Sequence, residues 1–174
     1  MVNTHLDQIV EYPAKVMNII SQSNECVGLL VNKSFGDVNE DDIDIALDKY
    51  ITNYEYVDNT VQETCAFIWV EAEVDRVENQ QIKDMKLYVT VACHKEFMKL
   101  KSSVFKGVIG NRRDNLTRFI DNLLNGAIIM GIGSLKLESV RTRTPINNFT
   151  MRELCYSIPD FNKSGSKWNL HMKI

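Results

Sequence analysis

The feature that most constrains the fold is an amphipathic helical pattern between two pairs of strand-like runs. Apolar residues recur at helical spacing from Leu116 to Leu124, and Gly126 fits the left-handed position that often follows a helix. Four strand-like runs flank this pattern, two before it and two after it: residues 65–74, 85–93, 131–140 and 149–157. This order predicts an α+β domain, in which one long helix packs across an antiparallel or mixed sheet of about four strands.

The chain before the first predicted strand reads as short helices and an acidic loop. Pro13 suits a helix entrance, and Ser23 can cap a second short helix that runs to Leu30. We expect a single domain over residues 1–161. Its parts are N-terminal helices in 1–34, an acidic loop with a short helix in 35–64, and the sheet and long helix in 65–161. Residues 162–174 are expected to form a flexible tail or docking arm.

Length and charge restrict the class of protein. A chain of 174 residues can bury a proper core, and its net charge of −3 is too small to imply a polyanionic partner. No apolar run approaches the roughly 20 residues needed to cross a bilayer, and the start of the chain does not read as a secretion leader. We therefore expect no membrane partner and maturation in a cytoplasm.

Cysteine spacing argues against a metal site. The 4 cysteines are far apart, and no Cys-x-x-Cys pair is present. Cys93 and His94 are neighbours in a predicted strand, where adjacent side chains point to opposite faces. We expect free buried thiols, no metal and no cofactor.

No motif predicts a catalytic centre. The segment Gly131-Ile-Gly-Ser lacks the remaining residues of a phosphate loop and precedes a strand rather than a helix. No serine lies in a Gly-x-Ser-x-Gly context. Glu71, Glu73 and Lys86 could be imagined as part of a metal-dependent nuclease, but cross-strand charge pairs on a solvated face explain them more simply. The chain is not expected to be an enzyme.

Charge is distributed unevenly along the chain. Residues 35–64 contain nine acids and one lysine, whereas residues 95–118 contain seven bases and two acids. These segments can be two unrelated solvated faces. They also suit a head-to-tail contact between copies that closes a ring, or the basic segment alone can contact nucleic acid. The residues that we single out for a self-association or partner surface are Asp41, Asp42, Asp44, Lys99, Lys101, Lys106, Arg112 and Arg113.

The order of motifs resembles the tail-terminator, or tail-completion, family of neck proteins in tailed bacteriophages. The resemblance covers roughly residues 65–161 and rests on short motifs. They are Arg112-Arg113 leading to Leu123-Leu124-Asn125-Gly126, then Gly131-Ile-Gly-Ser-Leu135, and Asn147-Asn148-Phe149. The long hairpin and the acidic segment before it fit the same layout.

This resemblance implies a structural virion protein that is assembled in the host cytoplasm. It implies a homo-oligomeric, usually hexameric, ring at the head–tail junction, which terminates the tail tube and offers the docking surface for the head. Its partners would be the tail tube protein and head connector proteins, and DNA would pass through the lumen without sequence-specific binding.

Two other functions remain open at this stage. One is a nucleic-acid-binding module, which would use the basic residues 95–118 and the aromatic side chains Phe67, Trp69 and Tyr88, expected to be exposed. The other is the nuclease considered above.

Overall fold

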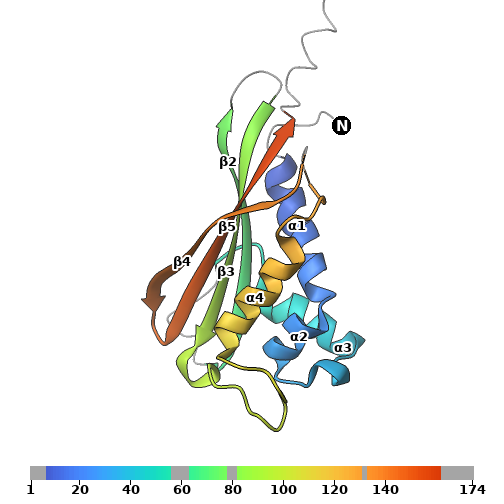
Figure 1. The fold of residues 1–174 in the computed structure, drawn as a ribbon, viewed down its shortest axis with the longest axis vertical. Helices are drawn as coiled ribbons and strands as arrows, with labels where there is room; N and C mark the ends of the chain where they lie inside the picture. The colour runs from blue at the N-terminus through green and yellow to red at the C-terminus, as the bar shows by residue number, and fades with distance from the viewer. Residues whose placement is uncertain (1–6, 56–62, 78–81, 131–132, 162–174) are drawn as a thin grey trace, which may run out of the picture.

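The protein is an α+β structure with helices on one side of a mixed five-stranded sheet (Figure 1). The computed structural model describes residues 7–55, 63–77, 82–130 and 133–161. Its elements, in chain order, are α1 (Asp7–Ser21), α2 (Asn24–Val31), η1 (Phe35–Asp37), α3 (Glu40–Ile45), η2 (Ala46–Tyr50), β1 (Ile51–Thr52), β2 (Ala66–Val77), β3 (Ile82–His94), η3 (Lys95–Phe97), α4 (Arg112–Leu124), β4 (Lys136–Ile146) and β5 (Phe149–Phe161).

The sheet has the order β1-β2-β3-β5-β4. The predicted hairpin is confirmed, because β2 and β3 are antiparallel and pair Ala66 with Cys93. Both strands are longer than predicted. The prediction of about four strands is close but omits one: Ile51 and Thr52 form a short parallel strand beside Ile68 and Trp69. Two residues carry too little alternation to be recognised as a strand.

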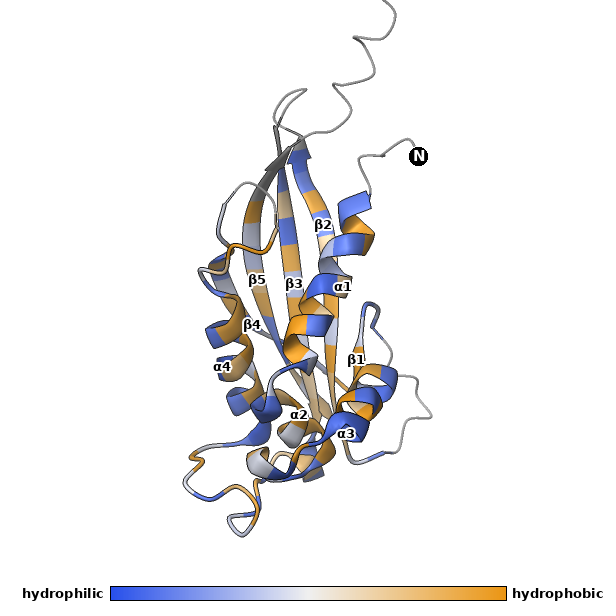
Figure 2. Cartoon of the chain, turned by 90° about the vertical axis from the view of Figure 1, so that its right-hand side faces the viewer, coloured by the Kyte–Doolittle hydropathy of each residue, from blue (hydrophilic) through white to orange (hydrophobic). Residues whose placement is uncertain are grey.

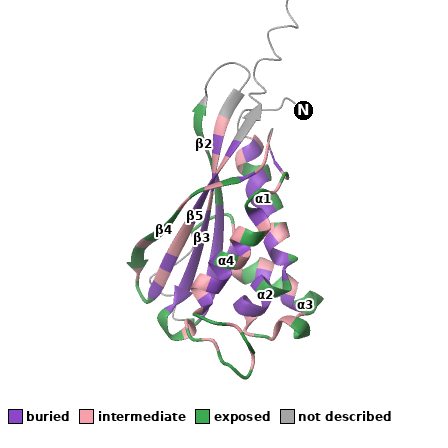
Figure 3. Ribbon diagram, in the orientation of Figure 1, coloured by how far each residue is buried: buried purple, intermediate pink, exposed green. Residues whose placement is uncertain are grey.

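The long helix packs across the sheet as predicted. Leu116, Ile120 and Leu124 are fully buried in the main core, and the Tyr156 hydroxyl of β5 donates a hydrogen bond to Asp121 of α4 (3.1 Å). Asn111 caps the helix by accepting the amide of Asp114 at 2.9 Å, and Gly126 has the expected positive φ of 84°. Figure 3 shows buried positions where the helices face the sheet. Spacing and capping residues therefore specify this element locally.

The N-terminal part contains three α-helices, but they are not all short as predicted: α1 has 15 residues and is longer than α4, which has 13. Ser23 caps α2 as predicted, with its hydroxyl accepting the amide of Cys26. Pro13 is not at a helix entrance but inside α1, which begins at Asp7. Proline normally weakens a helix interior. Here Tyr12, Val16 and Ile20 form a buried stripe on both sides of it, and this burial offsets the lost hydrogen bond.

The last two strands also differ from the prediction in their bounds. The predicted strand at 131–140 lies later, because β4 runs from Lys136 to Ile146. Pro145 lies inside this edge strand, and Asn147, at a φ of 52°, reverses the chain between β4 and β5. Gly131, Ile132 and the tail 162–174 lie outside the described residues.

A second, smaller cluster lies on the sheet face opposite the helices, which we call the open face. Phe67, Trp69, Phe149 and Met151 are buried there, and Trp69 is only 2% exposed. Arg143 of β4 reaches Glu55, beyond β1, at 3.1 Å. In a flat sheet four steps of about 4.8 Å separate β1 from β4. The chain after β1 and strand β4 must therefore approach each other over the open face.

All four cysteines are free and buried. Burial raises the pKa of Cys26, Cys65 and Cys93 to about 12. Thiols of this kind remain protonated and unreactive at neutral pH. Among the described residues, no helix is long and apolar enough to cross a membrane.

Candidate functional site

Helix α3 of the acidic segment and the loop before α4 lie at one end of the molecule, on different sides of it. Figure 2 shows α3 on one side of this end and the loop that leads into α4 on the other. We call residues 98–111 the basic loop. The rings of Phe35, before α3, and Phe105, in the loop, are 5.6 Å apart, so the two segments share an apolar support between them.

The acidic side is built on the first turn of α3. Asn39 and Asp42 form a capping box, in which each side chain accepts the other's backbone amide. Asp42 is buried and also pairs with Lys33 at 2.6 Å; hydrogen bonding to that ammonium group lowers its pKa. The prediction that Asp42 belongs to a contact surface is therefore corrected, because its charge is used within the subunit. Asp41 and Asp44 are exposed.

The basic loop carries the predicted lysines. Lys99, Lys101 and Lys106 are all exposed, and Ile109 beside them is 89% exposed. Phe105 is buried, so it fixes the middle of the loop to the body of the protein. The loop therefore presents positive charge and one large apolar side chain to solvent.

Arg112 anchors the base of this loop instead of contributing to its surface. It is 1% exposed, and its guanidinium group lies 3.7 Å from the centre of the Phe97 ring. It donates hydrogen bonds to the Phe97 carbonyl (2.8 Å), the Asn32 side chain (2.7 Å) and the Leu29 carbonyl. Burial lowers its pKa to about 10. Its placement on a partner surface is corrected: sequence cannot distinguish a buried arginine from a solvated one.

Arg113 is also largely engaged within the subunit. Its side chain is 13% exposed and pairs with Asp114 at 3.0 Å. Burial acts to raise the pKa of Asp114, but hydrogen bonds from Asn111 and Arg113 lower it overall. Arg152 of β5 adds a second cation to this carboxylate at 3.3 Å. The predicted contact residues that remain solvent-facing are Asp41, Asp44, Lys99, Lys101 and Lys106.

The open face carries a cluster of charges that the sequence analysis did not connect. Arg143 contacts Glu55 at 3.1 Å and Glu153 at 3.7 Å, and we call these three residues the clasp. Burial, followed by the charge of Glu55, raises the pKa of nearby Glu71. Alternation along β4 could have placed Arg143 on this face. No local signal pairs it with Glu55, which lies 88 positions away in the chain.

Some of the residues named for the two alternative functions are engaged within the subunit. Phe67 and Trp69 are 7% and 2% exposed, so they cannot stack on bases as the nucleic-acid hypothesis requires. Lys86, the lysine of the nuclease hypothesis, donates to Glu138 and lies 3.8 Å from Asp75. Within the described residues, no group of three or more His, Cys, Asp or Glu side chains could hold a metal ion.

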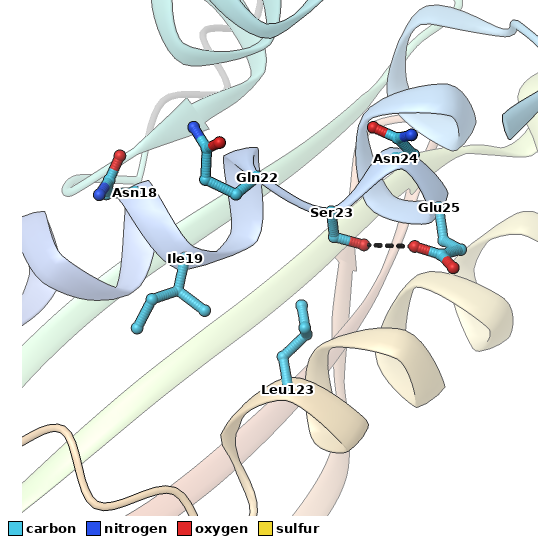
Figure 4. A pocket seen from close by; sticks show the side chains of 7 residues that line it. All are labelled: Asn18, Ile19, Gln22, Ser23, Asn24, Glu25 and Leu123. Carbon is cyan, nitrogen blue, oxygen red and sulfur yellow. Dashed lines mark hydrogen bonds between the residues drawn. The ribbon is translucent and has the colours of Figure 1, made fainter. Parts of the chain in front are cut away.

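One open pocket of about 570 Å³ lies between the α1–α2 junction and α4 (Figure 4). Its lining residues are Asn18, Ile19, Gln22, Ser23, Asn24, Glu25 and Leu123. Ser23 donates to Glu25 at 2.9 Å and also caps α2, so its hydroxyl is already committed. The pocket is lined by the side-chain amides of Asn18, Gln22 and Asn24 and by two apolar side chains, Ile19 and Leu123. None of its lining residues is an activated nucleophile.

These observations define a small α+β protein. Its described surface carries acidic side chains on α3 and basic side chains on the basic loop, on different sides of one end. The chain belongs to the YomW family, whose model matches residues 18–158. The family name is of a Bacillus phage type and suggests a phage-associated protein. This agrees with the bacteriophage setting that the resemblance implies. No curated protein matches the chain.

Proposed function

We propose that this protein is a structural component of a phage virion that forms a ring at the head–tail junction. In this role it terminates the tail tube and provides the surface to which the head docks. Its activity is assembly, and no catalytic step is assigned to it. The neighbouring tail tube and head connector proteins are its proposed partners, and the lumen passes DNA without sequence-specific contacts.

The observation that carries the proposal is the position of the two charged segments. Asp41 and Asp44 lie on one side of one end of the molecule, and the basic loop lies on the other side of the same end (Figure 2). A head-to-tail ring repeats one contact between two different surfaces of the subunit. Opposite charges on two sides of the same end of the subunit favour such a contact. They also fix how neighbouring copies are aligned.

The basic loop is suited to docking because its charged side chains are exposed while its base is fixed. Lys101 and Lys106 are exposed in a loop whose base is fixed by buried Arg112 and Phe105. A loop held in this way loses little conformational freedom when a partner binds. The phage association of the family supports a virion setting for this surface.

A charge-reversal experiment tests the proposal. Lys101→Glu combined with Lys106→Glu should raise the concentration needed for assembly by about tenfold, because each contact then becomes repulsive. Adding Asp41→Lys and Asp44→Lys should restore assembly. Asp42 is left unchanged, since it caps α3 and pairs with Lys33. Sedimentation velocity across a concentration series measures the result.

The matched control is Lys15→Glu combined with Lys136→Glu, which changes the net charge equally at exposed positions outside both charged segments. This control should assemble like the wild type. Equal loss of assembly in both double variants would contradict a specific contact and indicate general repulsion. Unchanged assembly in the Lys101/Lys106 variant would contradict the charge model directly.

A further inference from the structure

We infer that residues 167–174 form a strand that pairs with the outer edge of β2 in the same subunit, antiparallel to it, and so covers that edge of the sheet. These residues lie outside the described part of the chain, in the segment that follows β5. The pairing is made within one subunit and does not depend on the proposed ring.

The edge of β2 beyond β1 is open over residues 70–75. β1 pairs only with Ile68 and Trp69, and no other described strand lies on this side of β2. Residues 70–75 contain no proline, so they can take part in a regular strand pairing. An edge of this kind is a template for another strand, and natural sheets normally cover it.

Residues 167–174 have the pattern of a half-buried strand. Apolar and polar side chains alternate at every position of this segment. The apolar side chains are Trp168, Leu170, Met172 and Ile174, and the polar ones are Lys167, Asn169, His171 and Lys173. Strict alternation over such a length is a strong strand signal. A strand formed by this segment has one apolar face and one basic face.

The chain leaves β5 at the end of the sheet where β2 also ends. Phe161 pairs with Ile82 of β3, and Val77 of β2 pairs with the next residue of β3, Lys83. A strand that starts at this end of β2 runs antiparallel to it. To reach the outer edge of β2 from β5, the chain must cross three strand spacings, or about 14 Å, and the linker 162–166 can span up to about 17 Å. The resulting strand order is that of a Greek key, in which the last strand lies beside the first of three antiparallel strands.

On the open face, β2 carries charge of the opposite sign to this segment. Glu71 and Glu73 are exposed there, whereas residues 162–174 contain three lysines and no acid. When the apolar side chains of the added strand face the helices, Lys167 and Lys173 lie on the same face of the sheet as the two glutamates. Opposite charges on neighbouring strands stabilise their pairing.

On the helix side, an exposed apolar residue of α1 flanks the same edge. α1 packs over β2 (Figure 2), and its Ile19 lines the pocket to which Leu123 of α4 also contributes (Figure 4). Val10 precedes Ile19 by nine residues, which is about two and a half helical turns, so it lies on the opposite side of α1. Val10 therefore points away from α4, toward the outer edge of β2, and it is 68% exposed. The apolar face of the added strand would cover this side chain and remove it from water.

Hydrogen exchange of β2 measures whether the edge is covered. Leu170→Asp combined with Met172→Asp should speed the exchange of the outward-facing amides in residues 70–75 by about tenfold, because the added strand no longer protects them. Ser164→Asp combined with Ser166→Asp adds the same charge within the linker and should leave the exchange rate unchanged. Exchange that stays at the wild-type rate in the first variant would show that the segment does not occupy this edge.

Cross-linking in the full chain provides the direct readout. Lys173→Cys combined with either Glu71→Cys or Glu73→Cys, according to the register, should form a disulfide within one chain under mild oxidation. Facing residues of paired strands have Cβ atoms about 5 Å apart, which suits such a bond. Met172→Cys is the matched control, since it lies one position away and faces the helices. It should cross-link to the same partners at least about tenfold more slowly.

Equal cross-linking rates for positions 172 and 173 would indicate a segment without fixed pairing and would overturn the inference. A disulfide that joins two chains would also overturn it, because the segment would then belong to the edge of a neighbouring copy. Neither result depends on whether the wild-type protein forms the proposed ring, because denaturing electrophoresis without reductant separates single chains from linked pairs.

Discussion

At the residue scale, Arg112 shows how one side chain can fix a surface without belonging to it. Its guanidinium group joins α2, η3 and α4 through three carbonyl or amide oxygens and lies on the face of Phe97. Arginine suits this site because its planar group carries five donors and loses less hydration than an ammonium group. The basic loop depends on this anchor, since its two ends meet there.

Arg112→Met should lower the free energy of unfolding by about 3 kcal/mol, because it leaves buried oxygen atoms without donors. Arg118→Met is the comparison: Arg118 is exposed, and its loss should cost well under 1 kcal/mol. Urea denaturation of both variants measures the difference. Equal stabilities would show that Arg112 does not act as an anchor.

The same residue marks a limit of sequence reasoning. The spacing of Leu116, Ile120 and Leu124 predicts a buried helical stripe because apolar periodicity is a local property. The burial of Arg112 and Asp42 depends on Leu29, Asn32 and Lys33, which lie in other segments of the chain. A charged residue therefore reads as solvent-facing until its distant partners are known. For this reason Asp42 and Arg112 turn out to be engaged within the subunit, whereas Arg113 pairs with its own chain neighbour, Asp114.

At the scale of elements, the clasp determines the shape of the open face. Arg143 of β4 joins Glu55 beyond β1 and Glu153 of β5, and the aromatic cluster beneath these residues is buried. Alternation correctly predicted the faces of β2 and β3, including Glu71 and Glu73 on the side away from the helices. Alternation gave no indication that Phe67 and Trp69 on the open face would be buried. Their burial depends on β4, which lies at the opposite edge of the sheet.

Arg143→Ala should loosen this cover. Its ion pairs are partly exposed, so the loss of stability should be modest, about 1 kcal/mol. The sharper readout is Trp69 fluorescence in a Trp168→Phe background, where Trp69 is the remaining tryptophan. We expect a red shift and stronger acrylamide quenching in Arg143→Ala, and neither change in Lys15→Ala, an exposed site on α1. Quenching that stays at the wild-type level would indicate that the clasp does not protect the cluster.

At the scale of the whole molecule, helix α3 and the basic loop place opposite charges on different sides of one end of the subunit. In the proposed ring, one repeated head-to-tail contact would bring these two surfaces together between neighbouring copies. The fold class and the uneven charge along the chain were predictable from sequence, whereas the position of both charged surfaces at one end required the fold.

The most direct test of this account is the mass and appearance of the purified wild-type protein. Negative-stain images and sedimentation at low salt should show closed rings of uniform size, six subunits being the number that the family resemblance implies. Raising the salt concentration should dissociate them, because screening weakens the charged contacts. Particles of a single 20.0 kDa chain at every concentration and salt level would contradict the account.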